Sequence, residues 1–148
     1  MKSGKTFSTL IIVLLLALAI PNIISLIRGP AETPDVFANA YTLSEANQMS
    51  LESGKPVYVL ATADWCPPCQ TLKRGALIDP QVIEMIGEHA IPVYLEDGEN
   101  GAELRELGVQ SYPTTLILMN GQITSMISGG GNAKSYAGML SRELLGDQ

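Results

Sequence analysis

One stretch of the chain, Ala63–Gln70, constrains its fold more than any other. It holds the two cysteines, Cys66 and Cys69, and the single tryptophan, Trp65. An apolar run rich in β-branched and aromatic residues precedes the stretch and predicts a buried strand over 56–62. A helical pattern begins directly after Cys66. The two thiols are therefore expected at the point where a strand ends and a helix begins.

This placement favours redox chemistry at the cysteine pair. A sulfur at a helix N-terminus lies near the positive end of the helix dipole, which favours the thiolate of Cys66 and lowers its pKa. Cys69 follows one helical turn later and is placed to resolve a mixed disulfide formed on Cys66. A zinc site would need three or four protein ligands, and the chain offers only these two cysteines and one histidine. We therefore expect catalytic Cys66 (nucleophile) and Cys69 (resolving), with no metal and no other cofactor.

The remaining pattern predicts an α/β fold, with a central mixed sheet flanked by helices on both faces. Thr42 and Glu45 form a capping box, and Asn120-Gly121 is a strong signal for a hairpin turn. Residues 97–101 are predicted to form a turn-rich loop, and the acids Glu96, Asp97 and Glu99 are interpreted as a solvated turn. The predicted helices cover 43–53, 67–75, 80–88, 102–107 and 133–145. The predicted strands cover 36–41 (at the edge), 56–62, 91–96, 114–119 and 122–128.

The N-terminal part differs from the rest in hydropathy. Residues 7–27 are almost entirely apolar and would span about 30 Å as a helix, the thickness of a membrane's hydrocarbon core. The alternative is a signal peptide cleaved after Ala19, but such a cut would leave a strongly apolar new terminus. We favour an uncleaved transmembrane helix. The expected organisation is an anchor over 1–28, a linker over 29–35 and a globular domain over 36–148.

Charge indicates which side of the membrane the domain occupies and excludes some partners. Lys2 and Lys5 precede the apolar segment, so the positive-inside rule places the N-terminus in the cytoplasm and the domain on the periplasmic or extracellular side. From residue 29 onward the chain has six basic and fifteen acidic residues, a net charge of −9. This acidity argues against nucleic acid or an anionic lipid surface as the partner of the domain.

Two motifs together resemble a known family. Trp65-Cys-Pro-Pro-Cys69 follows an apolar strand, and Ser111-Tyr-Pro-Thr-Thr115 comes some forty residues later, as in the thioredoxin superfamily. The resemblance covers about residues 36–145. It is strongest to the C-terminal thioredoxin-like domain of transmembrane thiol:disulfide interchange reductases, where a Lys-Pro-Val strand and an Asp-Pro-x-Val helix also occur. Here those motifs begin at Lys55 and Asp79.

The resemblance implies a thioredoxin fold and a set of site residues. Pro113 is expected to follow a cis peptide bond and to pack against the dithiol. The backbone of Tyr112 is expected to pair with an extended substrate segment, and the loop near Gly129 to border the same groove. Trp65 is expected to shape the docking surface beside the cysteines.

The chain departs from the family pattern in two ways. Thioredoxins usually carry a buried aspartate six positions before the first cysteine, and here that position is Leu60. Water or Asp64 could take its place in proton transfer, although a solvated surface role is the simpler interpretation of Asp64. Both residues between the cysteines are prolines, Pro67 and Pro68, which lack N–H donors. We therefore expect the pKa of Cys66 to be lowered less than in a pair without prolines.

These inferences lead to one expected function and one alternative. The expected function is a membrane-anchored thiol:disulfide oxidoreductase that exchanges electrons with cysteine pairs of exported proteins, as a reductant rather than an oxidant. A reductase in an exported compartment must be recharged, so a membrane electron-donor protein is an expected partner. The alternative is a non-catalytic binding module that holds a thiol-containing partner or a metal ion in the same groove.

Overall fold

A computed structural model describes residues 11, 13, 16–17 and 29–146. By internal contacts the chain divides into two units, Met1–Pro30 and Ala31–Gln148. The predicted anchor over 7–27 lies almost entirely outside the described residues. Within the part that is described, no helix is long and apolar enough to cross a membrane.

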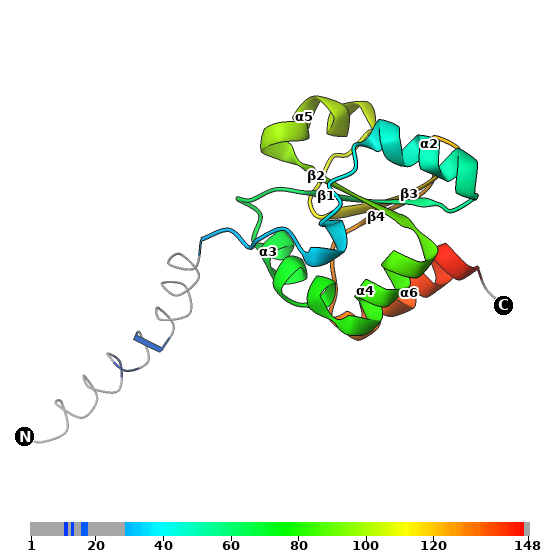
Figure 1. Cartoon of the computed structure of the whole chain (residues 1–148). Helices are drawn as coiled ribbons and strands as arrows, with labels where there is room; N and C mark the ends of the chain where they lie inside the picture. Colours follow the sequence, from blue (N-terminus) through cyan, green and yellow to red (C-terminus); the bar gives the residue numbers. More distant parts are fainter. Residues whose placement is uncertain (1–10, 12, 14–15, 18–28, 147–148) are drawn as a thin grey trace, which may run out of the picture. The chain divides into compact units, whose positions relative to one another are not determined.

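The second unit has the predicted α/β architecture, built on a four-stranded mixed sheet in the order β2-β1-β3-β4 (Figure 1). β1 pairs in parallel with β2 and antiparallel with β3, and β3 pairs antiparallel with β4. The strands are β1 (Val57–Thr62), β2 (Ile91–Glu96), β3 (Thr114–Met119) and β4 (Gln122–Ser128). The hairpin between β3 and β4 turns at Asn120 and Gly121, which both have positive φ angles, as the Asn-Gly pattern predicts.

Helices cover both faces of this sheet, which confirms the predicted arrangement. In Figure 1, α2 and α5 lie on one side of the strands, and α3, α4 and α6 lie on the other. The helices are α2 (Leu43–Ser53), α3 (Pro67–Arg74), α4 (Pro80–His89), α5 (Asp97–Glu106) and α6 (Ala133–Leu145), with short 3-10 turns η1 (Asp35–Phe37) and η2 (Ala76–Ile78).

Local signals set the ends of these helices as the sequence predicts. The hydroxyl of Thr42 accepts a hydrogen bond from the N–H of Glu45, and the Glu45 carboxylate accepts one from the N–H of Thr42. Gly54 ends α2 with a φ of 72°, a left-handed conformation that suits glycine. The Asp79 side chain caps α4, whose first residue is Pro80.

Two predictions of local structure are wrong. Residues 36–41 do not form an edge strand: the chain makes the turn η1, and Phe37 packs its ring against Tyr58 and Tyr94. Burial of this ring outweighs the weak strand pattern. Residues 97–101 are not a loop but the first part of α5, which the Glu96 side chain caps by accepting from the N–H of Gly98. A kink at Asn100, with φ −113° and ψ 19°, explains why the pattern looked irregular.

The sheet separates two hydrophobic clusters because its side chains alternate between faces. Tyr58 and Leu60 of β1 point toward α3, α4 and α6, whereas Val57 and Val59 point toward α2 and α5. All four side chains are fully buried. The dithiol follows the C-terminal end of β1, so this doubly covered strand fixes its position.

Candidate functional site

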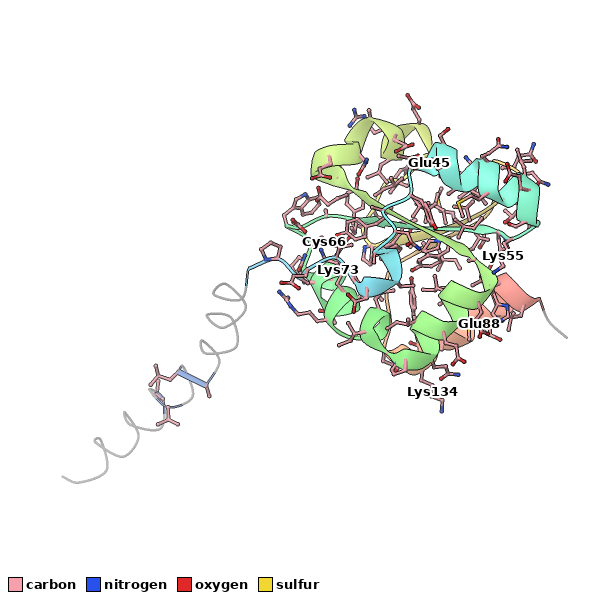
Figure 2. All side chains as sticks on the ribbon, viewed as in Figure 1. Glu45, Lys55, Cys66, Lys73, Glu88 and Lys134 are labelled. Atoms are coloured by element: carbon pink, nitrogen blue, oxygen red, sulfur yellow. A yellow bond between two sulfur atoms is a disulfide. The ribbon has the colours of Figure 1, made fainter. Side chains whose placement is uncertain are left out.

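Cys66 is the N-cap of α3, so the predicted strand-to-helix placement of the dithiol is present (Figure 2). Its sulfur accepts a hydrogen bond from the backbone N–H of Cys69, with 3.3 Å between the nitrogen and Sγ. Pro67 and Pro68 occupy the first two helical positions and have no N–H to offer. Cys69 therefore supplies the first N–H of the helix to the Cys66 sulfur.

The two cysteines form a disulfide, with their Cα atoms 5.3 Å apart. Cys66 is 3% exposed and Cys69 is 1% exposed. Both pack against Ala63 and the partly buried Tyr112. In this oxidised state the pair is enclosed by its neighbours, and Cys66 is the slightly more accessible of the two.

Trp65 and Tyr112 lie beside each other next to the disulfide. Trp65 is 70% exposed, and the two rings meet edge to face with centroids 5.9 Å apart. Asp97 joins them, because its carboxylate accepts from the Tyr112 hydroxyl at 2.8 Å and from the Trp65 indole N–H at 3.4 Å. Burial and the bond to Asp97 raise the pKa of Tyr112 to about 12, so its phenol remains a proton donor at neutral pH.

The Tyr112–Pro113 peptide bond is cis, as the family resemblance implies. The carbonyl of Pro113 accepts a hydrogen bond from the N–H of Gly129 at 2.7 Å, and Gly129 has a φ of 96° that disfavours any other residue. Tyr112, Pro113 and Gly129 are thus neighbours at one edge of the site. Their contact with a substrate remains a prediction.

The acidic residues Glu96, at the end of β2, and Asp97, at the start of α5, are structural partners of the site, not the solvated turn that the sequence suggested. The carboxylate of Glu96 accepts from the backbone N–H of Asp64 at 3.0 Å, in addition to capping α5. Asp97 binds Trp65 and Tyr112. Two adjacent acids therefore hold the segment before Cys66 to the end of β2. Their position at the C-terminal end of a buried strand was the available signal.

Lys73 is a buried charged residue near the site that the sequence interpretation did not single out. Its side chain is 1% exposed, and its ammonium donates to the Asp64 carboxylate at 3.1 Å and to the Tyr94 hydroxyl at 3.0 Å. Asp64 has a 53% exposed side chain, but it is paired rather than simply solvated. Leu60, at the position where thioredoxins usually carry an aspartate, is fully buried in the cluster that includes Leu72.

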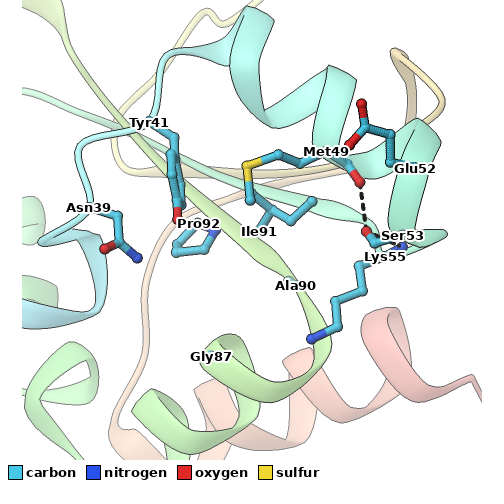
Figure 3. Close-up of a pocket in the computed structure, with 10 residues that line it drawn as sticks. All are labelled: Asn39, Tyr41, Met49, Glu52, Ser53, Lys55, Gly87, Ala90, Ile91 and Pro92. Atoms are coloured by element: carbon cyan, nitrogen blue, oxygen red, sulfur yellow. Dashed lines mark hydrogen bonds between the residues drawn. The ribbon is translucent and has the colours of Figure 1, made fainter.

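A well-formed pocket of the domain lies away from the cysteines. A pocket of about 440 Å³ lies at the N-terminal ends of β1 and β2, between α2 and the end of α4, where Tyr41 and Met49 face Pro92 and Lys55 reaches along the opening (Figure 3). The dithiol lies at the other end of these parallel strands. Among the described residues, no three histidine, cysteine, aspartate or glutamate side chains gather as metal ligands.

Comparison with known proteins gives one family and a set of relatives. A thioredoxin-like family model matches residues 38–119. The thiol:disulfide interchange protein DsbD of Escherichia coli is 33% identical over 84 residues, which cover 54% of this chain and 15% of DsbD. Thioredoxin 1 of Synechococcus elongatus is 28% identical over 107 residues, covering 72% of this chain and 97% of that protein. The chain thus matches only a small part of the DsbD proteins.

Solved structures show the same fold. A thioredoxin from Thermus thermophilus superposes with a TM-score of 0.62 at 21% identity, covering 70% of this chain and 84% of that one. The structure described as DsbH oxidoreductase superposes with a TM-score of 0.65 at 17% identity, covering 78% and 88%. These two structures therefore have the same arrangement of strands and helices as this chain.

Proposed function

Because this chain belongs to the thioredoxin-like family and is a thiol:disulfide oxidoreductase, we propose that it reduces cysteine pairs of exported proteins beside the membrane. One observation carries the proposal. Cys66 and Cys69 form a disulfide at the first turn of α3, where the first sulfur accepts the N–H of the second cysteine. These two sulfurs are the pair that a thiol:disulfide exchange would open and close.

The reaction proceeds in two balanced steps. The Cys66 thiolate attacks one sulfur of the substrate disulfide, which forms a mixed disulfide and releases the other substrate sulfur as a thiolate. The Cys69 thiolate then attacks the Cys66 sulfur, which releases the second substrate sulfur and closes the disulfide seen here. The substrate gains two electrons and the protein loses two. Protons from solvent complete the substrate thiols.

The first turn of α3 supports reduction rather than oxidation. A strongly oxidising dithiol needs a well stabilised thiolate, because that stabilises the reduced form. In this chain Pro67 and Pro68 remove two N–H donors from the helix N-terminus. We therefore expect a reduction potential nearer to about −270 mV than to about −120 mV.

The membrane position is supported by the N-terminal sequence. Residues 7–27 have the length and apolar character of a transmembrane helix, and Lys2 and Lys5 precede them. DsbD, which matches the domain, is named as a thiol:disulfide interchange protein. The proposal therefore includes a cytoplasmic N-terminus, a domain on the periplasmic or extracellular side, and a membrane protein that returns electrons to the dithiol after each turnover.

A reductase assay tests the activity. The full chain, purified in detergent, is expected to accelerate the reduction of a protein disulfide by dithiothreitol, and Cys66→Ser is expected to abolish the acceleration. A full chain with no activity above the Cys66→Ser control would refute the proposed reaction.

A trapping experiment separates the enzyme from the alternative binding module. In a Cys69→Ser variant the second step is blocked, so an exchange enzyme accumulates mixed disulfides that disappear on treatment with dithiothreitol. A non-catalytic module would bind its partners equally well with and without Cys69. Cys66→Ser is the matched control, because it removes the attacking sulfur and leaves Cys69.

A labelling experiment tests the location. In intact cells that contain the Cys69→Ser variant, a membrane-impermeant maleimide is expected to modify Cys66 after mild reduction. A variant that lacks residues 1–28 should remain in the cytoplasm and resist the same reagent until the cells are lysed. Modification of the full chain only after lysis would contradict the proposed orientation.

A further inference from the structure

The domain contains a buried cation one helical turn beyond the dithiol. Lys73 is the one charged side chain that is buried among residues 29–146. A buried ammonium is costly unless it is paired and hydrogen-bonded. Lys73 meets that requirement with two partners, Asp64 and Tyr94, and its Nζ also lies 5.6 Å from the centre of the Tyr94 ring.

The cation and the disulfide share one face of α3. Lys73 follows Cys69 by four positions, so the two side chains lie on the same helix face, and both are buried. A helical side chain leans toward the N-terminus, which directs Lys73 over the turn that contains Cys69. Its partner Asp64 lies two residues before Cys66. Cys66 caps the start of this helix and Lys73 lies in its last turn, as the labels in Figure 2 allow the reader to follow.

The ammonium is held there in its charged form. Burial lowers the pKa of Lys73, but the hydrogen bonds to Tyr94 and Asp64 together raise it above its usual value. The positive charge therefore persists throughout the pH range in which a thiol titrates. Asp64 is more exposed than Lys73, so solvent weakens the field of the carboxylate more than that of the ammonium.

The other ionisable groups around the dithiol have partners of their own. Glu96, at the end of β2, binds the N–H of Asp64, and Asp97, at the start of α5, binds Trp65 and Tyr112. The phenol of Tyr112 is neutral below about pH 12. Lys73 is thus a buried positive charge whose acidic partner is Asp64, two residues before Cys66.

We infer that Lys73 is a positioning residue whose ammonium stabilises the Cys66 thiolate in the reduced protein, and that Asp64 limits the effect. Pro67 and Pro68 leave the helix N-terminus with few donors, and Leu60 replaces a buried acid that would oppose a thiolate. The cation supplies part of the stabilisation that the prolines remove. This inference rests on the proposed exchange reaction and says how the attacking sulfur of that reaction is activated.

The test compares the two members of the ion pair in the full chain. The pH midpoint for iodoacetamide alkylation of Cys66 is measured in the reduced protein. Lys73→Met removes the positive charge and is expected to raise the midpoint by about one pH unit. Asp64→Asn leaves the cation uncompensated and is expected to lower the midpoint by roughly half a unit. Lys73→Arg keeps the charge and is expected to stay near the wild-type value.

Opposite signs are the diagnostic result, because a general loosening of the site would move both variants in the same direction. The reduction potential is expected to shift with the thiolate's stability, becoming more negative in Lys73→Met and less negative in Asp64→Asn. Each shift should be at most about 30 mV, which corresponds to a tenfold change in the equilibrium constant. Equal midpoints for wild type and Asp64→Asn, or shifts of the same sign, overturn the inference. If Lys73→Met does not fold, the other two variants still test the inference, which requires a lower midpoint in Asp64→Asn and a midpoint near the wild-type value in Lys73→Arg.

The alkylation measurement does not depend on turnover. A wild-type protein without reductase activity would refute the proposed function and leave the midpoints interpretable. An active protein whose midpoint is insensitive to these charges would refute only the role of Lys73.

Discussion

The two faces of the sheet are built from different kinds of side chain. Toward α2 and α5, the buried members of the cluster are all aliphatic, for example Val59 and Leu118. Toward α3, α4 and α6, the cluster contains Tyr58 and Tyr136, and Lys73 lies on the same side of the sheet. The dithiol belongs to α3. The face that carries the chemistry is therefore the one that contains buried aromatic hydroxyls and a buried cation.

A chain of hydroxyl groups shows how that face satisfies its polar atoms. The hydroxyl of Tyr136 lies 2.6 Å from that of Tyr58 and 2.7 Å from that of Thr115, and all three side chains are buried. Each hydroxyl has a partner, so the desolvation cost of burial is offset. The other face packs aliphatic side chains and has one fully buried hydroxyl from α2, that of Ser50. The difference indicates that one face supplies stability and the other also orients specific groups.

The largest effect on stability is expected from Leu118→Ala. Leu118 is 1% exposed and pairs with Val57 at the end of the sheet remote from the dithiol. The cavity left on the aliphatic face should cost about 2–5 kcal/mol in the free energy of unfolding. Urea denaturation measures this loss, and the alkylation midpoint of Cys66 is expected to remain at its wild-type value. A shifted midpoint would contradict the separation of the two faces.

Tyr136→Phe is expected to have the next largest effect. It removes the central hydroxyl and leaves those of Tyr58 and Thr115 buried with a missing partner. The expected loss is about 1–3 kcal/mol. Ala137→Gly, on the same helix, is a control for general weakening of α6. A Tyr136→Phe variant as stable as the wild type would show that the hydroxyl chain contributes nothing.

The polar face is also expected to determine stability at high pH. Burial raises the pKa of Tyr58 well above 10.0 and also raises the pKa of Tyr136. The pKa of each tyrosine is higher in the folded protein than in the unfolded chain. Its contribution to the free energy of unfolding is therefore complete below pH 10 and decreases as the pH rises through the pKa of the folded state. Unfolding in urea at pH 9, 10 and 11 should reveal a loss of roughly 1 kcal/mol per tyrosine over the last unit. If the free energy of unfolding falls with pH equally in the wild type and in a Tyr58→Phe/Tyr136→Phe variant, the two tyrosines are not the cause of the loss.

The smallest effects are expected from two buried hydroxyls that have no hydrogen-bond partner. Ser50 in α2 and Thr62 at the end of β1 are both fully buried, and neither side-chain oxygen has a partner among the described residues. Ser50→Ala and Thr62→Val remove these unsatisfied groups, so stability should remain within about 0.5 kcal/mol or rise by up to about 1 kcal/mol. A loss above 1 kcal/mol in either variant would indicate a partner such as bound water.

The sequence predicted most of the fold because the decisive signals are local. The capping box at Thr42, the Asn120-Gly121 turn and the apolar run of β1 each depend on neighbouring residues. The segment around Phe37 was predicted wrongly, since its conformation depends on rings from β1 and β2 that are distant in sequence.

The site was predictable only where it depends on the cysteine motif. The spacing of Cys66 and Cys69 indicated the exchange chemistry, and the Ser111–Thr115 motif indicated the cis proline. The roles of Lys73 and Asp97 depend on contacts across 9 and 32 positions of sequence with Asp64 and Trp65. Such pairs leave no periodic pattern, so only the folded chain reveals them.

The single tryptophan gives the protein a built-in optical reporter. Trp65 adjoins Cys66 in sequence and is largely solvent-exposed, and no second indole contributes to the emission. Disulfides quench nearby excited indoles by accepting an electron, so opening the Cys66–Cys69 bond should brighten the fluorescence. The oxidation state of the dithiol can thus be followed in real time without a label, in the intact chain and during turnover.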